Sequence, residues 1–299
     1  MVGLRIVDPH MHLWDLDRHY YSWLQDEPLP NNPAGDVSPI AYKSYGLSDY
    51  FRDASGWEVA GLVHVECGLP RENQLSETDW LQGLAAEGGY PQGIVAGAEL
   101  NDLELEPLLA AHAERPNVRG VRQIVNWHPD RAKTYTQRDL LQDDQWRRGF
   151  ALLANYGLRF DLQIYPGQMA DAARLAGEHP DIAMILNHTG MPTDRDDAGL
   201  QQWRDGMTLL AEHPNVSVKI SGLGMVDRGW TTESIRPFVL QTIETFGVDR
   251  CMFASNFPVE SIHGAFSAHY GAYDEITRDF SDDERARLFA GTAENIYRL

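Results

Sequence analysis

Short apolar runs rich in β-branched residues recur eight times along this chain of 299 residues, and amphipathic stretches separate most of them. Strands that alternate with helices are typical of a parallel sheet with both faces covered. Eight such units predict a (β/α)8 barrel, with residues 1–299 as one domain. The predicted strands are Leu4–His10, Val59–Glu66, Ile94–Leu100, Val118–Val125, Leu158–Ile164, Ile182–Asn187, Val216–Ser221 and Cys251–Asn256. The predicted helices are Asp79–Glu87, Leu103–Ala113, Asp144–Tyr156, Gln168–His179, Leu200–His213 and Glu233–Phe246.

The main alternative fold is an open, doubly wound sheet that binds a dinucleotide. Its fingerprint is a Gly-x-Gly-x-x-Gly turn after the first strand, and no such turn follows Leu4–His10. The sequence therefore favours the barrel.

Charge and hydropathy exclude several classes of function. A formal net charge of −19 repels phosphate backbones, so we expect no nucleic-acid partner. No apolar run reaches the roughly 18 residues of a membrane span, and no signal peptide is recognisable, so we expect a cytoplasmic protein without a membrane partner. Cys67 and Cys251 both lie in apolar runs, which favours buried thiols over a disulfide. A small molecule is the expected partner, and a homo-oligomer is left open.

Two histidines close the first predicted strand, in the segment Val7-Asp8-Pro9-His10-Met11-His12. Residues at i and i+2 of a strand point to the same face, so His10 and His12 can converge on one metal ion or one substrate. In a barrel, this position opens the active site.

The segment 20–45 follows this strand and is rich in Pro, Asn, Asp and aromatic residues, with little periodicity. A long loop after a barrel strand lies over the active-site face, so we interpret it as a lid or pocket wall. Tyr21 and Trp23 within the segment, and Trp14 just before it, are candidate apolar contacts to the substrate. The alternative is an ordered surface loop that does not touch substrate.

Several further segments occur in the order found in one family of hydrolases. Together with Asp8–Trp14 they are Tyr21–Leu24, Arg119–Arg122, Leu186–Pro192, Val218–Leu223, Arg250–Val259 and Gly291–Leu299. From the first strand to the last residue, the chain resembles the amidohydrolase-related TIM-barrel hydrolases. The resemblance is to their lactonase-like branch, which includes sugar lactonases and pyrone-dicarboxylate lactonase.

The resemblance implies a site at the carboxyl ends of the strands, with one divalent metal ion, commonly zinc. His10 and His12 match the first-strand metal pair, and His188 matches a sixth-strand histidine that assists with the proton or the oxyanion. Arg122 matches a fourth-strand arginine that contacts an anionic or carbonyl group of the substrate.

Two positions depart from this pattern. Gln163 stands where the fifth strand often carries a histidine ligand, and Asn256 stands where the eighth strand usually carries a catalytic aspartate. A neutral amide binds zinc weakly and has no usable protonation near neutral pH, so Asn256 is expected to act through hydrogen bonds. The cofactor thus stays open between a divalent metal, zinc first, and none.

Other residues are weaker candidates. Glu260 could replace the lost carboxylate, Asp161 could face inward from its strand, and His64 and Glu66 form a second same-face pair. Arg122 could instead form an internal salt bridge, with Glu66 or Glu99 as its partner. His128, His263 and His269 fall in loops after the fourth and eighth strands, within reach of a substrate.

The sequence predicts a hydrolase that opens a small carboxylated or sugar-derived lactone by attack of water on the carbonyl. We expect His188, Asn256, His10 and His12 to be catalytic, and Arg122, Gln163, Trp14 and Tyr21 to bind substrate. The general base stays open among His10, His12, His188 and Glu260. The alternative functions are a decarboxylase or C–C hydrolase on the same barrel, and a ligand-binding protein without activity.

Overall fold

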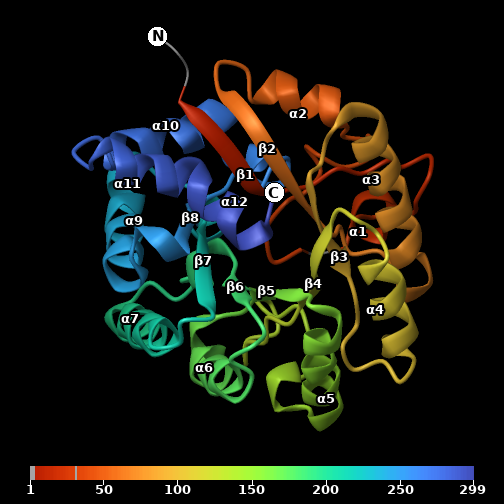
Figure 1. The fold of residues 1–299 in the computed structure, drawn as a ribbon. Coiled ribbons are helices and arrows are strands. Elements are labelled where there is room, and N and C mark those ends of the chain that lie inside the picture. The colour runs from red at the N-terminus through yellow and green to blue at the C-terminus, as the bar shows by residue number, and fades with distance from the viewer. Residues whose placement is uncertain (1–3, 31) are drawn as a thin grey trace.

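The computed structural model describes residues 4–30 and 32–299, and in these residues eight strands form one parallel sheet (Figure 1). Residues 1–3 and 31, which belong to the predicted domain and loop, lie outside the described residues. Each strand pairs with its neighbour in sequence, so the predicted (β/α)8 barrel is confirmed. The strands are β1 (Arg5–Met11), β2 (Glu58–Val65), β3 (Gly93–Gly97), β4 (Val118–Ile124), β5 (Arg159–Gln163), β6 (Met184–Leu186), β7 (Val216–Ile220) and β8 (Cys251–Phe253).

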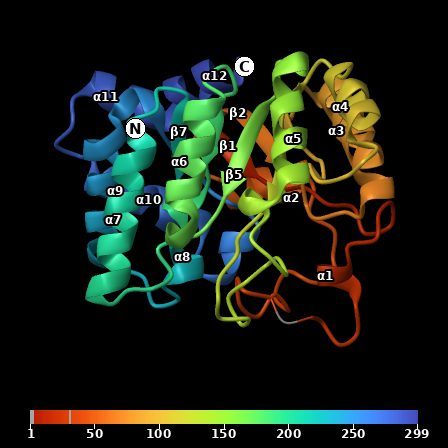
Figure 2. The same cartoon turned by 90° about the horizontal axis from the view of Figure 1, so that it is seen from below.

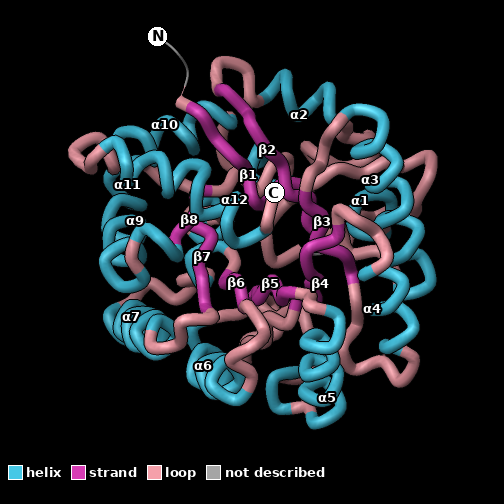
Figure 3. The backbone as a smooth tube through the Cα atoms, viewed as in Figure 1, coloured by secondary structure: helices cyan, strands magenta, loops and turns pink. Residues whose placement is uncertain are grey.

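Helices surround the strands, as the tube in Figure 3 shows. Six of them coincide with the predicted amphipathic stretches: α3 (Gln74–Gly88), α4 (Leu105–Ala113), α5 (Asp144–Leu152), α6 (Met169–Glu178), α7 (Asp197–Ala211) and α9 (Thr232–Phe246). The sequence did not predict α1 (Ser22–Gln25), α2 (Leu47–Asp53), α8 (Leu223–Val226), α10 (Phe266–Ile276), α11 (Asp282–Ala286) and α12 (Thr292–Tyr297). Side-chain caps start several helices; Asp143, for example, accepts hydrogen bonds from the backbone of Gln145 and Trp146 at the start of α5.

The barrel interior is apolar at one end and polar at the other. Val7, Val63, Ile185 and Met252 point inward and pack against Tyr297 of α12, which closes the end away from the site. Side chains that follow on the same inward faces are polar or ionisable. This polar layer forms the floor of the functional site.

A bulge in β1 aims the first-strand histidines. Asp8 pairs with Leu62 and Met11 with His64, so β1 carries one more residue than β2 across this step. Val7 and His10 would face opposite sides of a regular strand, but with the extra residue both face the interior. Asp8 instead faces the helices, where it accepts a hydrogen bond from Tyr50 of α2 (2.7 Å).

The barrel closes between β1 and the segment that follows β8. His12 N donates to Phe257 O (2.7 Å) and Asn256 N donates to His10 O (2.8 Å). The buried carboxylate of Asp8 also accepts hydrogen bonds from the backbone and the hydroxyl of Ser255. This seam fixes His12 and Asn256 relative to each other.

Figure 2 shows the barrel from the side, with α1 and α8 at one end and α12 at the other. The end with α1 is where the strands finish and where the segment 20–45 lies. Within residues 4–30 and 32–299, no helix combines the length and the hydropathy that a membrane crossing requires.

Candidate active site

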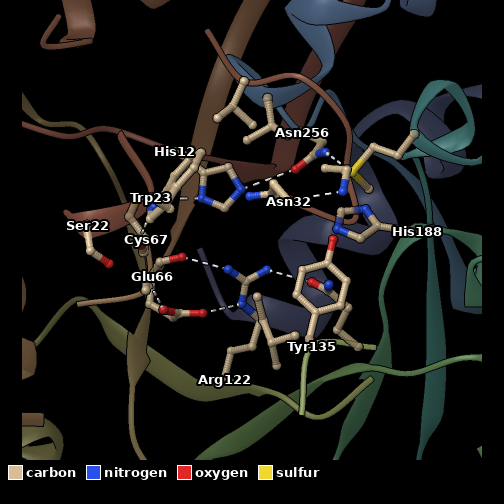
Figure 4. A pocket seen from close by; sticks show the side chains of 17 residues that line it. His12, Ser22, Trp23, Asn32, Glu66, Cys67, Arg122, Tyr135, His188 and Asn256 are labelled. Atoms are coloured by element: carbon tan, nitrogen blue, oxygen red, sulfur yellow. Dashed lines mark hydrogen bonds and ion pairs between the residues drawn. The ribbon is translucent and has the colours of Figure 1, made fainter. Parts of the chain in front are cut away.

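A cavity of about 310 Å³ opens at the carboxyl ends of the strands (Figure 4). Its polar wall comes from six different strand ends and includes His12, Glu66, Arg122, Gln163, His188 and Asn256. Its apolar wall comes mostly from the segments that follow the strands and includes Trp23, Ala34, Val37, Ile124, Met225 and Val259. A cavity of this size fits one small ring, with polar groups aimed at one side of it.

Arg122 of β4 is held in one orientation by the residues around it. Its Nε donates to Glu66 Oε1 (2.7 Å), its NH2 group donates to the backbone oxygen of Glu66 (2.7 Å), and its NH1 group donates to Gln163 Oε1 (3.0 Å). Glu66 is anchored in turn by the backbone N–H of Gly68 (2.6 Å). Arg122 therefore lines the cavity and also forms the internal salt bridge that the sequence left open, with Glu66 as its partner.

His10 lies beneath the cavity, between two cationic groups. Its Nδ1 is 3.4 Å from Nζ of Lys219 on β7, and its Nε2 is 3.5 Å from the NH1 group of Arg122. Burial and these positive charges hold the pKa of His10 well below its ordinary value, so the imidazole is neutral. Both of its ring nitrogens face N–H donors.

Lys219 is a buried residue that the sequence patterns did not single out. Its ammonium group pairs with Asp161 of β5, and both side chains are fully buried. Burial lowers the pKa of Lys219 to about 8, and Asp161 also accepts from Tyr297 (2.8 Å) and Asn187 (3.1 Å). The available signal was the alternation Val-Ser-Val-Lys-Ile-Ser, which places Lys219 on the inward face of its strand.

His12 presents a nitrogen lone pair on the cavity side. Its Nδ1 is 2.7 Å from the backbone oxygen of Val65, which can only accept, so this nitrogen carries the proton. Burial, with Arg122 nearby, lowers the pKa of His12 to about 3. Its Nε2 lies 3.2 Å from Oδ1 of Asn256, and neither of these two atoms carries a proton. A half-turn of the Asn256 amide exchanges Oδ1 for the NH2 group, which can then donate to Nε2. His12 and Asn256 therefore act as one hydrogen-bonded unit across the seam.

His188 follows β6 and carries a ring nitrogen that is free to meet a substrate. Its Nδ1 is 3.0 Å from Ser221 Oγ, whereas its Nε2 makes no hydrogen bond to any residue that the structure describes. Burial, with Arg122 and Lys219 nearby, holds the pKa of His188 well below its ordinary value. A neutral imidazole can accept a proton or donate a hydrogen bond, and Ser221 suits either arrangement because a hydroxyl both donates and accepts.

The backbone is strained at two of these positions. His188 and Asn256 both adopt the left-handed conformation, each with φ of 55°, which is uncommon for residues other than glycine. Glycine at position 222 leaves room for His188, because a Cβ at Gly222 would lie 2.6 Å from the Cβ of His188. The fold thus holds both side chains at the strand ends at some cost in free energy, as functional sites often do.

Of the three aromatic residues predicted as substrate contacts, Trp23 lines the cavity, and Trp14 and Tyr21 do not. Trp14 is buried, donates to Lys43 O (2.9 Å) and packs edge-on against Trp23, with their ring centroids 5.5 Å apart. Tyr21 is buried, and its hydroxyl donates to Glu77 (3.1 Å). Neither side chain lines the cavity, whereas Trp23 does. Trp14 and Tyr21 therefore hold the wall from behind.

The weaker candidates also take definite places. Glu260 is buried behind the wall and accepts a hydrogen bond from Met225 N (3.2 Å), so it does not face the cavity. His64 and Glu66 diverge because β2 ends at Val65; the ring of His64 accepts from Leu13 N (3.1 Å) outside the barrel. Asp161 does face inward, below the cavity. The remaining loop histidines, His128, His263 and His269, do not line the cavity.

The wall also includes residues that no pattern in the sequence pointed to. Tyr135 comes from the loop after β4, and Ser22 and Asn32 come from the lid segment. Loops without periodicity give no indication of which side chain turns inward, so these contacts depend on the folded loops.

The donor set does not fit a zinc site of the family type. Both nitrogens of His10 face cationic donors, and Gln163 Oε1 is taken by Arg122. Among the described histidines, cysteines and acidic residues, three ligand atoms come within 4.8 Å of one another at one place, in His64, Cys67 and Glu77. There Nδ1 of His64 accepts a backbone N–H, so its proton sits on the nitrogen that a metal would need.

The sequence of the whole barrel matches one known family. The family model described as Amidohydrolase matches residues 7–299. The chain belongs to the amidohydrolase family. Its recognition from the strand-end motifs is thereby confirmed.

Three similar proteins cover the chain almost end to end. An uncharacterised protein, y4mH of Sinorhizobium fredii, is 44% identical over 300 residues and covers 100% of both chains. An L-fucono-1,5-lactonase of Burkholderia ambifaria is 24% identical over 308 residues, covering 98% of this chain and 95% of its own. The crystal structure of an amidohydrolase from Burkholderia multivorans with bound zinc superimposes with a TM-score of 0.81 at 23% identity, covering 98% of this chain and 99% of its own.

Proposed function

We propose that this amidohydrolase opens the ring of a small lactone by hydrolysis, with His188 as the general base. The observation that carries the proposal is Nε2 of His188 at the cavity wall, which makes no hydrogen bond within residues 4–30 and 32–299. The other candidate bases are engaged or hidden: His10 lies between two cations, His12 faces Asn256, and Glu260 is behind the wall. The similarity to L-fucono-1,5-lactonase supports a lactone as the substrate.

The chemistry needs a base, a nucleophilic water and a place for negative charge. His188 takes a proton from water as the oxygen attacks the ring carbonyl. The developing oxyanion is stabilised by the guanidinium of Arg122 and by the amide of Asn256. The acyl C–O bond of the ring then breaks, and the proton held by His188 passes to the departing ring oxygen, which becomes a hydroxyl. Water and the lactone thus combine to give a single product, a hydroxy acid.

This route has no metal-dependent step. The zinc in the Burkholderia multivorans structure belongs to a relative that is 23% identical. In this chain the cationic groups of Arg122 and Lys219 flank the histidine that would be a ligand. We propose that Arg122 supplies the positive charge that a metal ion would otherwise supply.

The test is hydrolysis of a panel of aldonolactones, followed as acid release against a buffer blank. We expect turnover by the wild-type protein and a loss of about 100-fold or more in kcat for His188→Ala, the usual contribution of a general base. His128→Ala is the matched control, since His128 lies outside the cavity and contacts Asp194, and it should keep wild-type activity.

The proposal fails if no lactone is hydrolysed faster than in buffer, or if His188→Ala retains wild-type kcat. Tight binding of a lactone without turnover would instead favour the ligand-binding protein without activity.

A further inference from the structure

The charge balance of the cavity carries a further inference, which rests on the proposed lactonase function. Among the described residues that line the cavity, Glu66 and Arg122 are the two charged ones. They are paired with each other at 2.7 Å, and each side chain is less than 10% exposed. The site therefore contains one cation, Arg122, and the carboxylate of Glu66 already neutralises it.

The layer beneath the cavity is balanced in the same way. Lys219 and Asp161 form a second ion pair, with both side chains fully buried. The two positive and two negative charges cancel, so the site has no net positive charge with which to hold a substrate carboxylate. Burial lowers the pKa values of His12 and His188, which adds two neutral rings and no cation.

We infer that this site selects an uncharged lactone, and that Glu66 is the residue that excludes a carboxylated one. A carboxylate brought into the cavity would have to displace Glu66 from Arg122 or stay unpaired near it. An unpaired buried charge is strongly unfavourable, and like charges in contact add to the cost.

The uncharged part of the wall suits a neutral ring. Glu66, Gln163 and Asn256 offer hydrogen-bonding groups on the strand side, which match hydroxyl groups. Trp23 and Val37 of the lid segment offer apolar surface on the other side. The substrate class is therefore a neutral, hydroxylated lactone with one apolar face.

The same charge balance assists release of the product. Ring opening converts a neutral ester into a hydroxy acid, which ionises and gives its proton to solvent. The new carboxylate then stands near Glu66 without a free cation, so it is repelled from the cavity.

The test compares matched substrates. The first is the neutral aldonolactone that the wild-type protein hydrolyses fastest, and the second is its analogue with a carboxylate on the terminal carbon. We expect kcat/KM at least about 30-fold lower for the carboxylated analogue. Glu66→Gln keeps the shape of the side chain and frees Arg122 from its carboxylate. In this variant the ratio of kcat/KM for the neutral lactone to kcat/KM for the carboxylated analogue should fall at least about 10-fold.

Glu87→Gln makes the same change in net charge on the exposed surface of α3 and should leave the ratio unaltered. If the wild-type protein hydrolyses the carboxylated analogue equally fast or faster, the selection of an uncharged lactone is wrong, but the proposed lactonase function is not affected. An unchanged ratio in a folded Glu66→Gln protein overturns the role of Glu66. Absence of any lactone turnover overturns the proposed function itself.

Discussion

At the scale of single residues, the site depends on how each imidazole is held. His10, His12 and His188 are all neutral because burial and nearby cations lower their pKa values. Their neighbours give them different roles: cations enclose His10, a carbonyl fixes the proton of His12, and a serine leaves His188 free to accept. Three residues of one type thus have different surroundings, and only those of His188 suit the base that we propose.

Lys219 and Asp161 give a prediction for stability. Lys219→Met removes one partner of a fully buried ion pair and leaves Asp161 without its cation. We expect the free energy of unfolding to fall by about 3–5 kcal/mol, measured by urea denaturation. The double variant Lys219→Met/Asp161→Asn should lose less, because no charge is left unpaired. A single variant within about 1 kcal/mol of the wild type would show that the pair is not needed.

At the scale of elements, the strands and the ends of strands could be predicted, because apolar periodicity encodes them directly. Every observed strand overlaps its predicted run, and His10, His12, Arg122 and His188 do converge on one barrel end. The strands β3 and β8 end three residues early. The residues that follow leave the sheet, and after β8 they bring Asn256 to the cavity, whereas those after β3 do not line it. A hydropathy pattern does not distinguish such residues from a longer strand.

The contacts that each side chain makes could not be predicted from the sequence. The pairing of Lys219 with Asp161 joins residues 58 positions apart. The bulge in β1, which turns His10 inward, shows only in the register with β2. Trp14 and Tyr21 were predicted to contact substrate, but both side chains are buried and do not line the cavity. Such features depend on long-range packing, which local patterns do not carry.

At the scale of the whole molecule, buried ionisable groups link stability to pH. Burial raises the pKa values of Glu77 and Glu260 to about 8, from an ordinary value of 4.5. A carboxyl with a raised pKa in the folded state stabilises fully below about pH 4.5, and this stabilisation is lost as the pH rises through about 8. The buried histidines act the other way, since their lowered pKa values cost stability only as the pH falls below about 6.5.

Between about pH 6.5 and 8 the two carboxyls therefore dominate, and the free energy of unfolding should fall as the pH rises. Urea denaturation across this range measures the slope. Glu77→Gln removes one of the two carboxyls and should make the slope shallower, with the contribution of Glu260 remaining, whereas Glu87→Gln, exposed on α3, should leave the slope unchanged. A wild-type slope that is zero or rising, or an unchanged slope in Glu77→Gln, would contradict this assignment.

In the proposed reaction, the chain's own side chains open a lactone without a metal ion. The most direct measurement is the metal content of freshly purified protein, paired with lactone hydrolysis before and after treatment with a chelator. The account predicts that activity does not follow metal content and survives removal of the metal. Loss of activity on chelation, with recovery when zinc is restored, would contradict it.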